Sequence, residues 1–303
     1  MTQFRPSGFA LFSQPAMRLH RPKVFAVLPT LLTLGNAACG FGAITFAAKV
    51  GPEPMDVNHL WTAGVLIFLA MIFDMLDGSA ARWTKQTSEF GAELDSLCDG
   101  VSFGVAPAFL MLQFVKHYQN LGGGASTFYS YPPRLLWVIA VLYCVCALLR
   151  LARFNVETDE DDSHDSFSGL PSPAAAGTVA AFPIAMNGLI ELANDTAAPA
   201  HAIADWFIPV VKFSLPLITL AAAMLMVSRL RYPHVFNQVF RGQRSRQHLI
   251  QIVFTAACVF LVREMALPLI FCYFAFSAPV RVLWNETIAR RFSKSEPPAR
   301  PTP

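Results

Sequence analysis

The stretch DMLDGSAARWTKQTSEFGAELDSLCD, residues 74–99, carries four aspartates between two apolar segments of the chain. Asp74 and Asp77 are three positions apart, and Asp95 and Asp99 are four apart, so each pair shares one face of a helix. Carboxylates beside such apolar segments are costly unless they are paired or coordinated. The spacing therefore predicts two helices whose acidic faces oppose each other.

The composition of the whole chain places these aspartates in a membrane protein. Hydrophobic residues make up 54% of the 303 residues, charged residues only 14%, and the mean hydropathy is +0.44. An ordinary soluble domain carries about 25% charged residues, and a disordered chain needs few apolar ones. These values exclude a soluble enzyme and a disordered protein, and the formal net charge of +3 is too small to indicate a nucleic-acid partner.

Charge-free segments predict about eight membrane helices, and hence an all-α integral membrane protein. Six of them cover residues 24–48, 60–73, 101–115, 135–149, 166–190 and 213–228. Two shorter runs, 249–262 and 265–280, predict a C-terminal helical hairpin. The remaining parts are an N-terminal segment at 1–23, a basic loop at 229–248, and a tail at 281–303 that its proline content predicts to be partly disordered.

The basic residues predict the orientation of these spans. An even number of spans places both termini on one side of the membrane, and 18 of the 23 lysines and arginines then fall on that side. Cytoplasmic loops carry the excess of Lys and Arg in membrane proteins. Both termini and the four aspartates are therefore expected to be cytoplasmic.

The residues around the aspartates suit a metal ion and a phosphate ligand. Four carboxylates in one place repel each other, and hard divalent ions such as Mg²⁺ or Mn²⁺ remove that repulsion. Gly78 and Ala81 lack side-chain bulk on the face that holds the first pair, so a nucleotide can approach the backbone. Arg82 can bind phosphate oxygens, and Gly91 permits close packing where the next helix starts.

Other interpretations of the same residues remain open at this point. Arg82 is also an ordinary cytoplasmic flank, and the aspartates could line an ion path in a cation or proton transporter. A transporter, however, usually shows two related halves, and no internal repeat is visible. A polyprenyl transferase needs two aspartate-rich motifs, whereas the sequence has one.

Taken together, the pattern D-x2-D-G-x2-A-R-x8-G-x3-D-x3-D resembles the motif of the CDP-alcohol phosphotransferase family. Members of this family are membrane enzymes that use a CDP-linked donor to make a phosphodiester. The resemblance implies a six-helix core over residues 24–228, with the C-terminal hairpin as an addition, and a homodimer. It also implies two divalent cations held by Asp74, Asp77, Asp95 and Asp99, with Asp99 as the general base.

Three further segments resemble the bacterial and archaeal phosphatidylserine synthase branch of that family. They are LPTLLTLGNAACGFGAI at 28–44, DSLCDGVSFGVAPA at 95–108, and RLARFN at 150–155 followed by FSGLPSPAAAG at 167–177. This resemblance implies transfer of a phosphatidyl group from CDP-diacylglycerol to L-serine in a bacterial inner membrane, with release of CMP. Other branches, which accept glycerol 3-phosphate, inositol phosphate or choline, are the alternative.

A serine site needs a fixed cation for the carboxylate and acceptors for the ammonium group. Arg150 and Arg153 lie at the cytoplasmic end of the fourth predicted span, and Asn155 follows them, so these three are the candidate serine ligands. The alternative role for the two arginines is that of ordinary cytoplasmic flanking residues. Thr33 and Asn36 on the first predicted helix are candidate contacts to the CDP-lipid. Hydrogen bonds between helices are the alternative role for those two.

Overall fold

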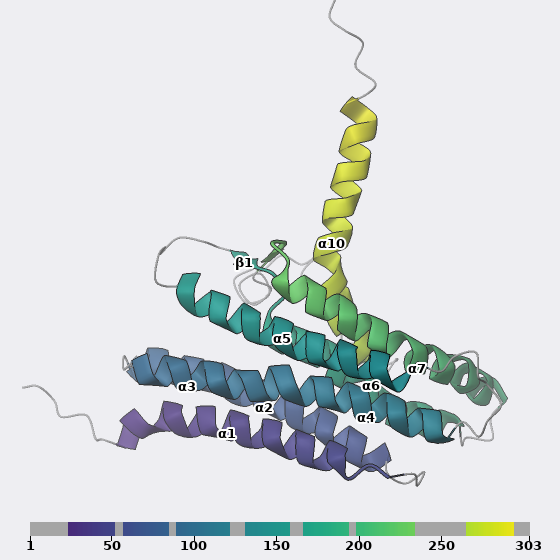
Figure 1. Cartoon of the computed structure of the whole chain (residues 1–303), viewed down its shortest axis with the longest axis horizontal. Coiled ribbons are helices and arrows are strands. Elements are labelled where there is room, and N and C mark those ends of the chain that lie inside the picture. The colour runs from purple at the N-terminus through teal and green to yellow at the C-terminus, as the bar shows by residue number, and fades with distance from the viewer. Residues whose placement is uncertain are drawn as a thin grey trace, which may run out of the picture.

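A computed structural model describes residues 24–51, 57–84, 89–121, 131–157, 166–193, 198–233 and 265–293 (Figure 1). The predicted N-terminal segment at 1–23, most of the basic loop at 229–248 and the first arm of the predicted hairpin at 249–262 lie outside these residues. The predictions for those segments therefore stay predictions.

The described part is built from long helices and one short two-stranded ribbon. The helices are α1 (Val24–Ala48), α2 (Val57–Thr84), α3 (Glu89–Asp99), the π-helix η2 (Gly100–Val105), α4 (Ala106–Leu121), α5 (Pro133–Glu157), α6 (Ser172–Ala193), α7 (Ala198–Val227) and α10 (Ala266–Ser293). Strands β1 (Ser166–Ser168) and β2 (Arg231–Pro233) pair antiparallel, with Phe167 opposite Tyr232. Helices α3, η2 and α4 follow one another without a break and form a single span.

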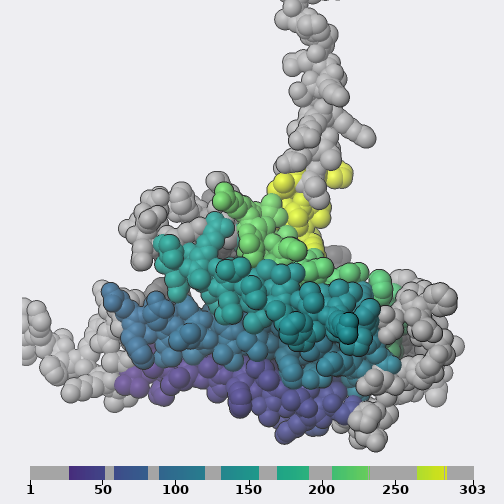
Figure 2. All heavy atoms as spheres, in the orientation of Figure 1, coloured from purple at the N-terminus to yellow at the C-terminus, as the bar shows by residue number. Residues whose placement is uncertain are grey.

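Six of these helical segments are long and apolar enough to cross a membrane, which confirms an all-α integral membrane protein. They lie side by side and form one packed body (Figure 2), and α10 rises from it at a steep angle (Figure 1). Large apolar side chains remain exposed on its outer face, among them Phe41 and Trp137. Such a surface suits lipid and not water.

The described residues hold six candidate spans rather than the eight that were predicted. The seventh predicted span lies outside the described residues, and the eighth corresponds to Ala266–Val282, a shorter apolar helix. About 20 residues are needed to span the hydrocarbon layer, so this stretch is short for a span. Helix α10 also continues past the predicted end at 280 to Ser293, because residues 281–293 contain no glycine or proline.

The fifth span begins later than predicted. Residues 166–168 form β1, and α6 starts only at Ser172. Gly169 has a φ of +83°, a conformation that ends a regular helix and that glycine adopts at low cost. Its N–H donates to the Leu230 carbonyl at 2.8 Å, so the turn before α6 is tied to the chain that leaves α7.

Small residues allow the helices around the aspartates to approach closely. On α1 the buried positions Thr33, Asn36, Gly40, Ala43 and Ala47 recur every three or four residues and form one face. A Cβ added to Gly40 would lie 2.7 Å from the Ser102 Cα of η2. The first helix therefore packs in backbone contact with the segment that follows Asp99.

Helix α10 packs on the core through its first half. The Phe271 ring occupies the space beside Gly177 of α6, and it meets the Phe68 ring of α2 edge-on, with 5.3 Å between the ring centroids. The Tyr232 hydroxyl of β2 donates to the Ala275 carbonyl at 2.9 Å. The ribbon and α10 are thus joined to each other as well as to the core.

Candidate functional site

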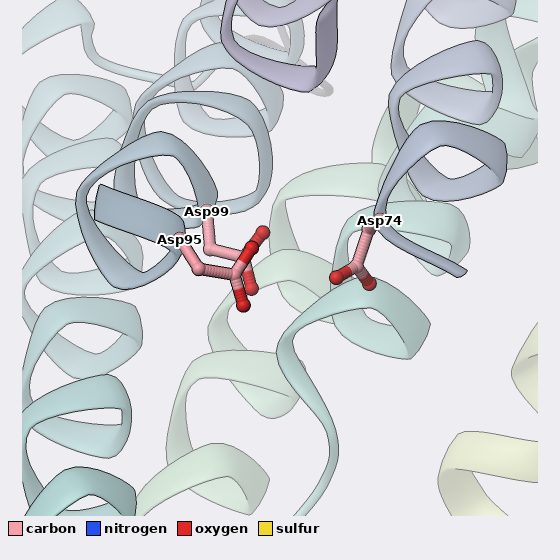
Figure 3. A group of neighbouring side chains, drawn as sticks. All are labelled: Asp74, Asp95 and Asp99. Carbon is pink, nitrogen blue, oxygen red and sulfur yellow. The ribbon is translucent and has the colours of Figure 1, made fainter. Parts of the chain in front are cut away.

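The four aspartates of the motif come together between α2 and α3. One carboxylate oxygen each of Asp74, Asp95 and Asp99 lies within 4.8 Å of the others. Figure 3 shows Asp74 pointing from α2 toward the two carboxylates that α3 contributes. Asp77, which is only 5% exposed, lies beside Asp95 and completes the group.

The local sequence explains why the acidic groups meet here. Helix α2 continues beyond its apolar stretch to Thr84, so Asp74 and Asp77 lie on its last turns. Helix α3 starts at Glu89, after a connection of only four residues, and brings Asp95 and Asp99 back along the same end of the bundle. As predicted, the acidic face of α2 lies opposite the acidic face of α3.

The donor set fits a divalent cation. Asp77 Oδ2 and Asp95 Oδ1 are buried and have no hydrogen-bond partner among the described residues. Buried polar atoms normally have a partner, because leaving one unpaired is costly. Carboxylate oxygens are the ligands that Mg²⁺ and Mn²⁺ prefer, so a divalent ion bound here would supply the missing interactions.

The two candidates on α1 contact the aspartates directly. The Asn36 amide Nδ2 donates to Asp99 Oδ1 at 2.8 Å, and the Asn36 side chain is fully buried. The Thr33 hydroxyl donates to the Pro29 carbonyl of its own helix at 3.0 Å, and its side chain lies beside Asp77. For Asn36 the structure therefore displays the alternative role, a hydrogen bond between helices.

Arg150 also reaches the acidic group. Its Nη1 donates to Ser172 Oγ at 2.7 Å, and the guanidinium lies within electrostatic reach of Asp99 and Asp74. Its Nε is buried and has no hydrogen-bond partner among the described residues. Arg150 thus offers a fixed cation, with a donor still to be satisfied, at the edge of the acidic cluster.

The other two candidate serine ligands are placed differently. Asn155 is bonded to Ser96 of α3, since its Nδ2 donates to Ser96 Oγ at 2.9 Å and its Oδ1 accepts from the same hydroxyl at 3.1 Å. Arg153 lies three residues beyond Arg150 on α5 and is half-buried. The Asn155 amide therefore links α5 to α3.

The remaining motif residues flank the aspartates along the two helices. Gly78 follows Asp77 on α2, and Gly91 lies in the first turn of α3. Ala81 and Arg82 belong to the last turn of α2, but their side chains lie outside what the structure describes. Their contacts to a donor substrate stay predictions.

Two serines and a tyrosine were missed by the sequence reasoning. Ser96 bonds Asn155, Ser102 Oγ donates to the Asn36 carbonyl at 2.9 Å, and the buried Tyr143 hydroxyl donates to the Phe103 carbonyl at 3.2 Å. Each of these contacts joins residues 40 or more positions apart. The small residues around Ser102 were a weak signal of close packing, but they do not identify the partners.

Comparison with known proteins agrees with this arrangement of acidic helices. A family model described as CDP-alcohol phosphatidyltransferase matches residues 26–227, from α1 to the end of α7. The chain belongs to the CDP-alcohol phosphatidyltransferase family. This membership does not favour the transporter or the polyprenyl transferase, and it leaves α10 outside the matched region.

Several curated relatives carry names of serine-specific enzymes. The CDP-diacylglycerol–serine O-phosphatidyltransferase of Mycobacterium bovis is 35% identical over 170 residues, 55% of this chain and 49% of the relative. The enzyme of that name from Helicobacter pylori strain 26695 is 32% identical over 208 residues, 69% of this chain and 72% of the relative. The archaetidylserine synthase of Methanothermobacter thermautotrophicus is 32% identical over 213 residues, 70% of this chain and 71% of the relative. The match thus spans about half the length of the mycobacterial relative.

Proposed function

We propose that this protein is a phosphatidylserine synthase, which transfers the phosphatidyl group of CDP-diacylglycerol to the hydroxyl of L-serine and releases CMP. The observation that carries the proposal is the convergence of Asp74, Asp95 and Asp99, with Arg150 beside them, inside the family core. The names of the relatives support serine as the acceptor.

In this proposal the four aspartates hold two divalent ions, Mg²⁺ or Mn²⁺. Bound there, the ions would offset the negative charge of the donor pyrophosphate and stabilise the leaving oxygen. Asp74, Asp77 and Asp95 are the main ligands, and Asp99 contributes to the second ion. The unpaired buried oxygens of Asp77 and Asp95 support this assignment.

The protein groups bring the acceptor to the phosphorus. Asp99 accepts the proton of the serine hydroxyl as that oxygen forms a bond to the phosphorus of the phosphatidyl group. The bond from this phosphorus to the bridging oxygen breaks, and CMP leaves with the electron pair. Arg82 holds donor phosphate oxygens, while Gly78, Ala81 and Gly91 leave room for the nucleotide.

Arg150 holds the serine carboxylate in this arrangement. Its Nη1 is fixed by Ser172, and a carboxylate would satisfy its unpaired Nε and the neighbouring nitrogen as a bidentate pair. Arg153 lies further along the same helix and adds positive charge. Asn155 contributes through Ser96, and not by direct contact with serine.

The proposed setting is a bacterial inner membrane, with the site and both termini cytoplasmic and with two copies of the chain forming a homodimer. The excess of basic residues on the side of the aspartates supports this orientation. The diacylglycerol tails then stay in the lipid, while the CDP group and serine meet at the cytoplasmic boundary. Neither substrate crosses the membrane.

The test is CMP release by the purified protein in detergent, supplied with CDP-diacylglycerol and either Mn²⁺ or Mg²⁺. The acceptors compared are L-serine, glycerol 3-phosphate, inositol phosphate and choline. Release that requires serine and that EDTA abolishes is the expected result. Release with another acceptor would overturn the serine assignment and leave Arg150 as a flanking residue, and no release from folded protein would overturn the proposed activity.

A further inference from the structure

The hydrogen bond between Asn36 and Asp99 joins the first helix to a buried carboxylate of the acidic cluster. Asn36 is fully buried and Asp99 is only 9% exposed, so water does not compete for this contact. Hydrogen bonds to a carboxylate are among the stronger ones in proteins. The amide therefore fixes Oδ1 of Asp99 and leaves Oδ2 as the oxygen that can turn toward a substrate.

Asn36 is itself held from the segment that follows Asp99. Ser102 of η2 is fully buried, and its hydroxyl donates to the Asn36 carbonyl at 2.9 Å. A backbone carbonyl has two lone pairs, so it can accept this bond together with one from its own helix. Gly40, one turn further along α1, lets the two backbones approach closely enough for the bond to form.

The π-helix η2 gives Ser102 its direction. A π segment inserts an extra residue into a helix, and such segments are frequent at functional sites. It begins directly after Asp99, and α5 supports it because the buried Tyr143 hydroxyl donates to the Phe103 carbonyl. Asp99 and Ser102, three residues apart, thus both contact Asn36 of α1.

We propose that Asn36 and Ser102 are positioning residues for Asp99, which keep its free oxygen directed at the acceptor hydroxyl. Asn36 acts on the carboxylate, and Ser102 acts through Asn36. The inference deepens the proposed function and rests on it for the role of Asp99 as the base. It gives Asn36 the role between helices that the sequence left open beside a contact to the CDP-lipid, since the Asn36 Nδ2 is bonded to Asp99 and the side chain is buried.

The kinetic test compares three variants with the wild type. Asn36→Leu removes the donor at nearly constant volume, and Ser102→Ala removes the hydroxyl that holds Asn36. The control is Thr219→Ala on α7, where the buried hydroxyl donates to the Leu215 carbonyl of its own helix. The kcat and the KM for each substrate are measured by CMP release, and the melting temperature in detergent monitors folding.

A positioning role predicts a loss in kcat and little change in KM. Losing a hydrogen bond to a charged group corresponds to about 10- to 100-fold, so this is the expected drop in kcat for Asn36→Leu. We expect a drop of about 3- to 10-fold for Ser102→Ala, because the amide itself remains, and no change for Thr219→Ala. An unchanged kcat in Asn36→Leu, or an equal loss in the control, would overturn the proposal.

A second measurement does not depend on activity. An experimental structure of Asn36→Leu should show the Asp99 carboxylate turned away from Asp74 and Asp95, whereas the wild type keeps the three within ligand distance of one another. Asp99 in its wild-type position in that variant would overturn the proposal. If the wild type releases no CMP with serine, the proposed function fails, and this structural comparison still decides whether Asn36 positions Asp99.

Discussion

Replacing Gly169 by alanine should loosen the turn that leads into α6 and, with it, the contact of Arg150. The residue has a φ of +83°, which costs an L-amino acid about 1–2 kcal/mol. The added Cβ would also lie 2.5 Å from the Met226 carbonyl oxygen and 3.0 Å from that of Ser228. Both atoms belong to the backbone, so a change of rotamer cannot move them away.

The loss of stability can be worked out from the contacts that the turn would lose. Relief of the overlap separates Gly169 from α7 and weakens two hydrogen bonds, Gly169 N–H to Leu230 at 2.8 Å and Leu170 N–H to Leu225 at 3.0 Å. Each bond contributes about 1 kcal/mol, so with the cost in φ the loss is about 3 kcal/mol. For a core of this size that corresponds to a decrease of about 6–12 °C in melting temperature.

The assay pairs thermal unfolding in detergent with the kinetics of CMP release. Ser172 lies three residues after Gly169 and holds Arg150, so the KM for serine should rise while the KM for CDP-diacylglycerol changes little. The matched control is Gly42→Ala on α1, where the new Cβ would meet only the Leu66 Cδ1 at 3.3 Å, a methyl group that can rotate away. If Gly169→Ala and the control have the same melting temperature and serine KM, the reasoning is refuted.

Three further outcomes are expected. Asp99→Asn should still bind CDP-diacylglycerol and Mn²⁺ in titrations but lose turnover by about 100-fold or more, and near wild-type turnover would remove Asp99 from the role of base. Arg150→Lys should raise the KM for serine by about 10-fold without changing that for CDP-diacylglycerol, because a lysine cannot form the bidentate pair; equal increases for both substrates would contradict a serine site. Burial raises the pKa of Tyr232 to about 12, whereas tyrosines of the unfolded chain ionise at about 10. The neutral Tyr232 hydroxyl, which donates to Ala275, should therefore stabilise the fold below pH 10, and this contribution should disappear as the pH rises through 12. Tyr232→Phe should lower the melting temperature at neutral pH and remove this alkaline dependence, which a pH series of melting curves will show.

Much of the core and of the acidic site was predictable because both depend on local patterns. The charge-free run at 24–48 has the same bounds as α1, since Lys23 and Lys49 flank both the run and the helix. The spacing of the aspartates defined their helix faces, and the short connection between α2 and α3 left little freedom in how those faces meet. A periodic signal over a few turns is sufficient for such inferences.

The sequence could not predict the contacts that join distant parts of the chain. The sequence left Asn36 open between a contact to the donor lipid and a hydrogen bond between helices, because its partner Asp99 is 63 residues away and no period in the sequence pairs the two. Asn155 was predicted to bind serine because it lies near Arg150, and its bond to Ser96, 59 residues away, could not be predicted in the same way. The start of α6 was set too early because residues 166–168 are as free of charge as the helix, and only the pairing with β2 makes them a strand.

The π-helix between Asp99 and Ala106 also separates two parts of one span, of which the first faces the polar site and the second faces the apolar core. In an unbroken α-helix the direction of the carboxylates would fix the direction of every later side chain, at about 100° per residue. The extra residue in η2 resets this angle, so the half before it can face the polar site while Leu110 and Phe114 beyond it face the core. Deleting one residue from 100–105 would therefore restore an ordinary helix and rotate the whole of α4 against its neighbours. A change in the number of residues in this segment should therefore disturb the packing more than a substitution within it.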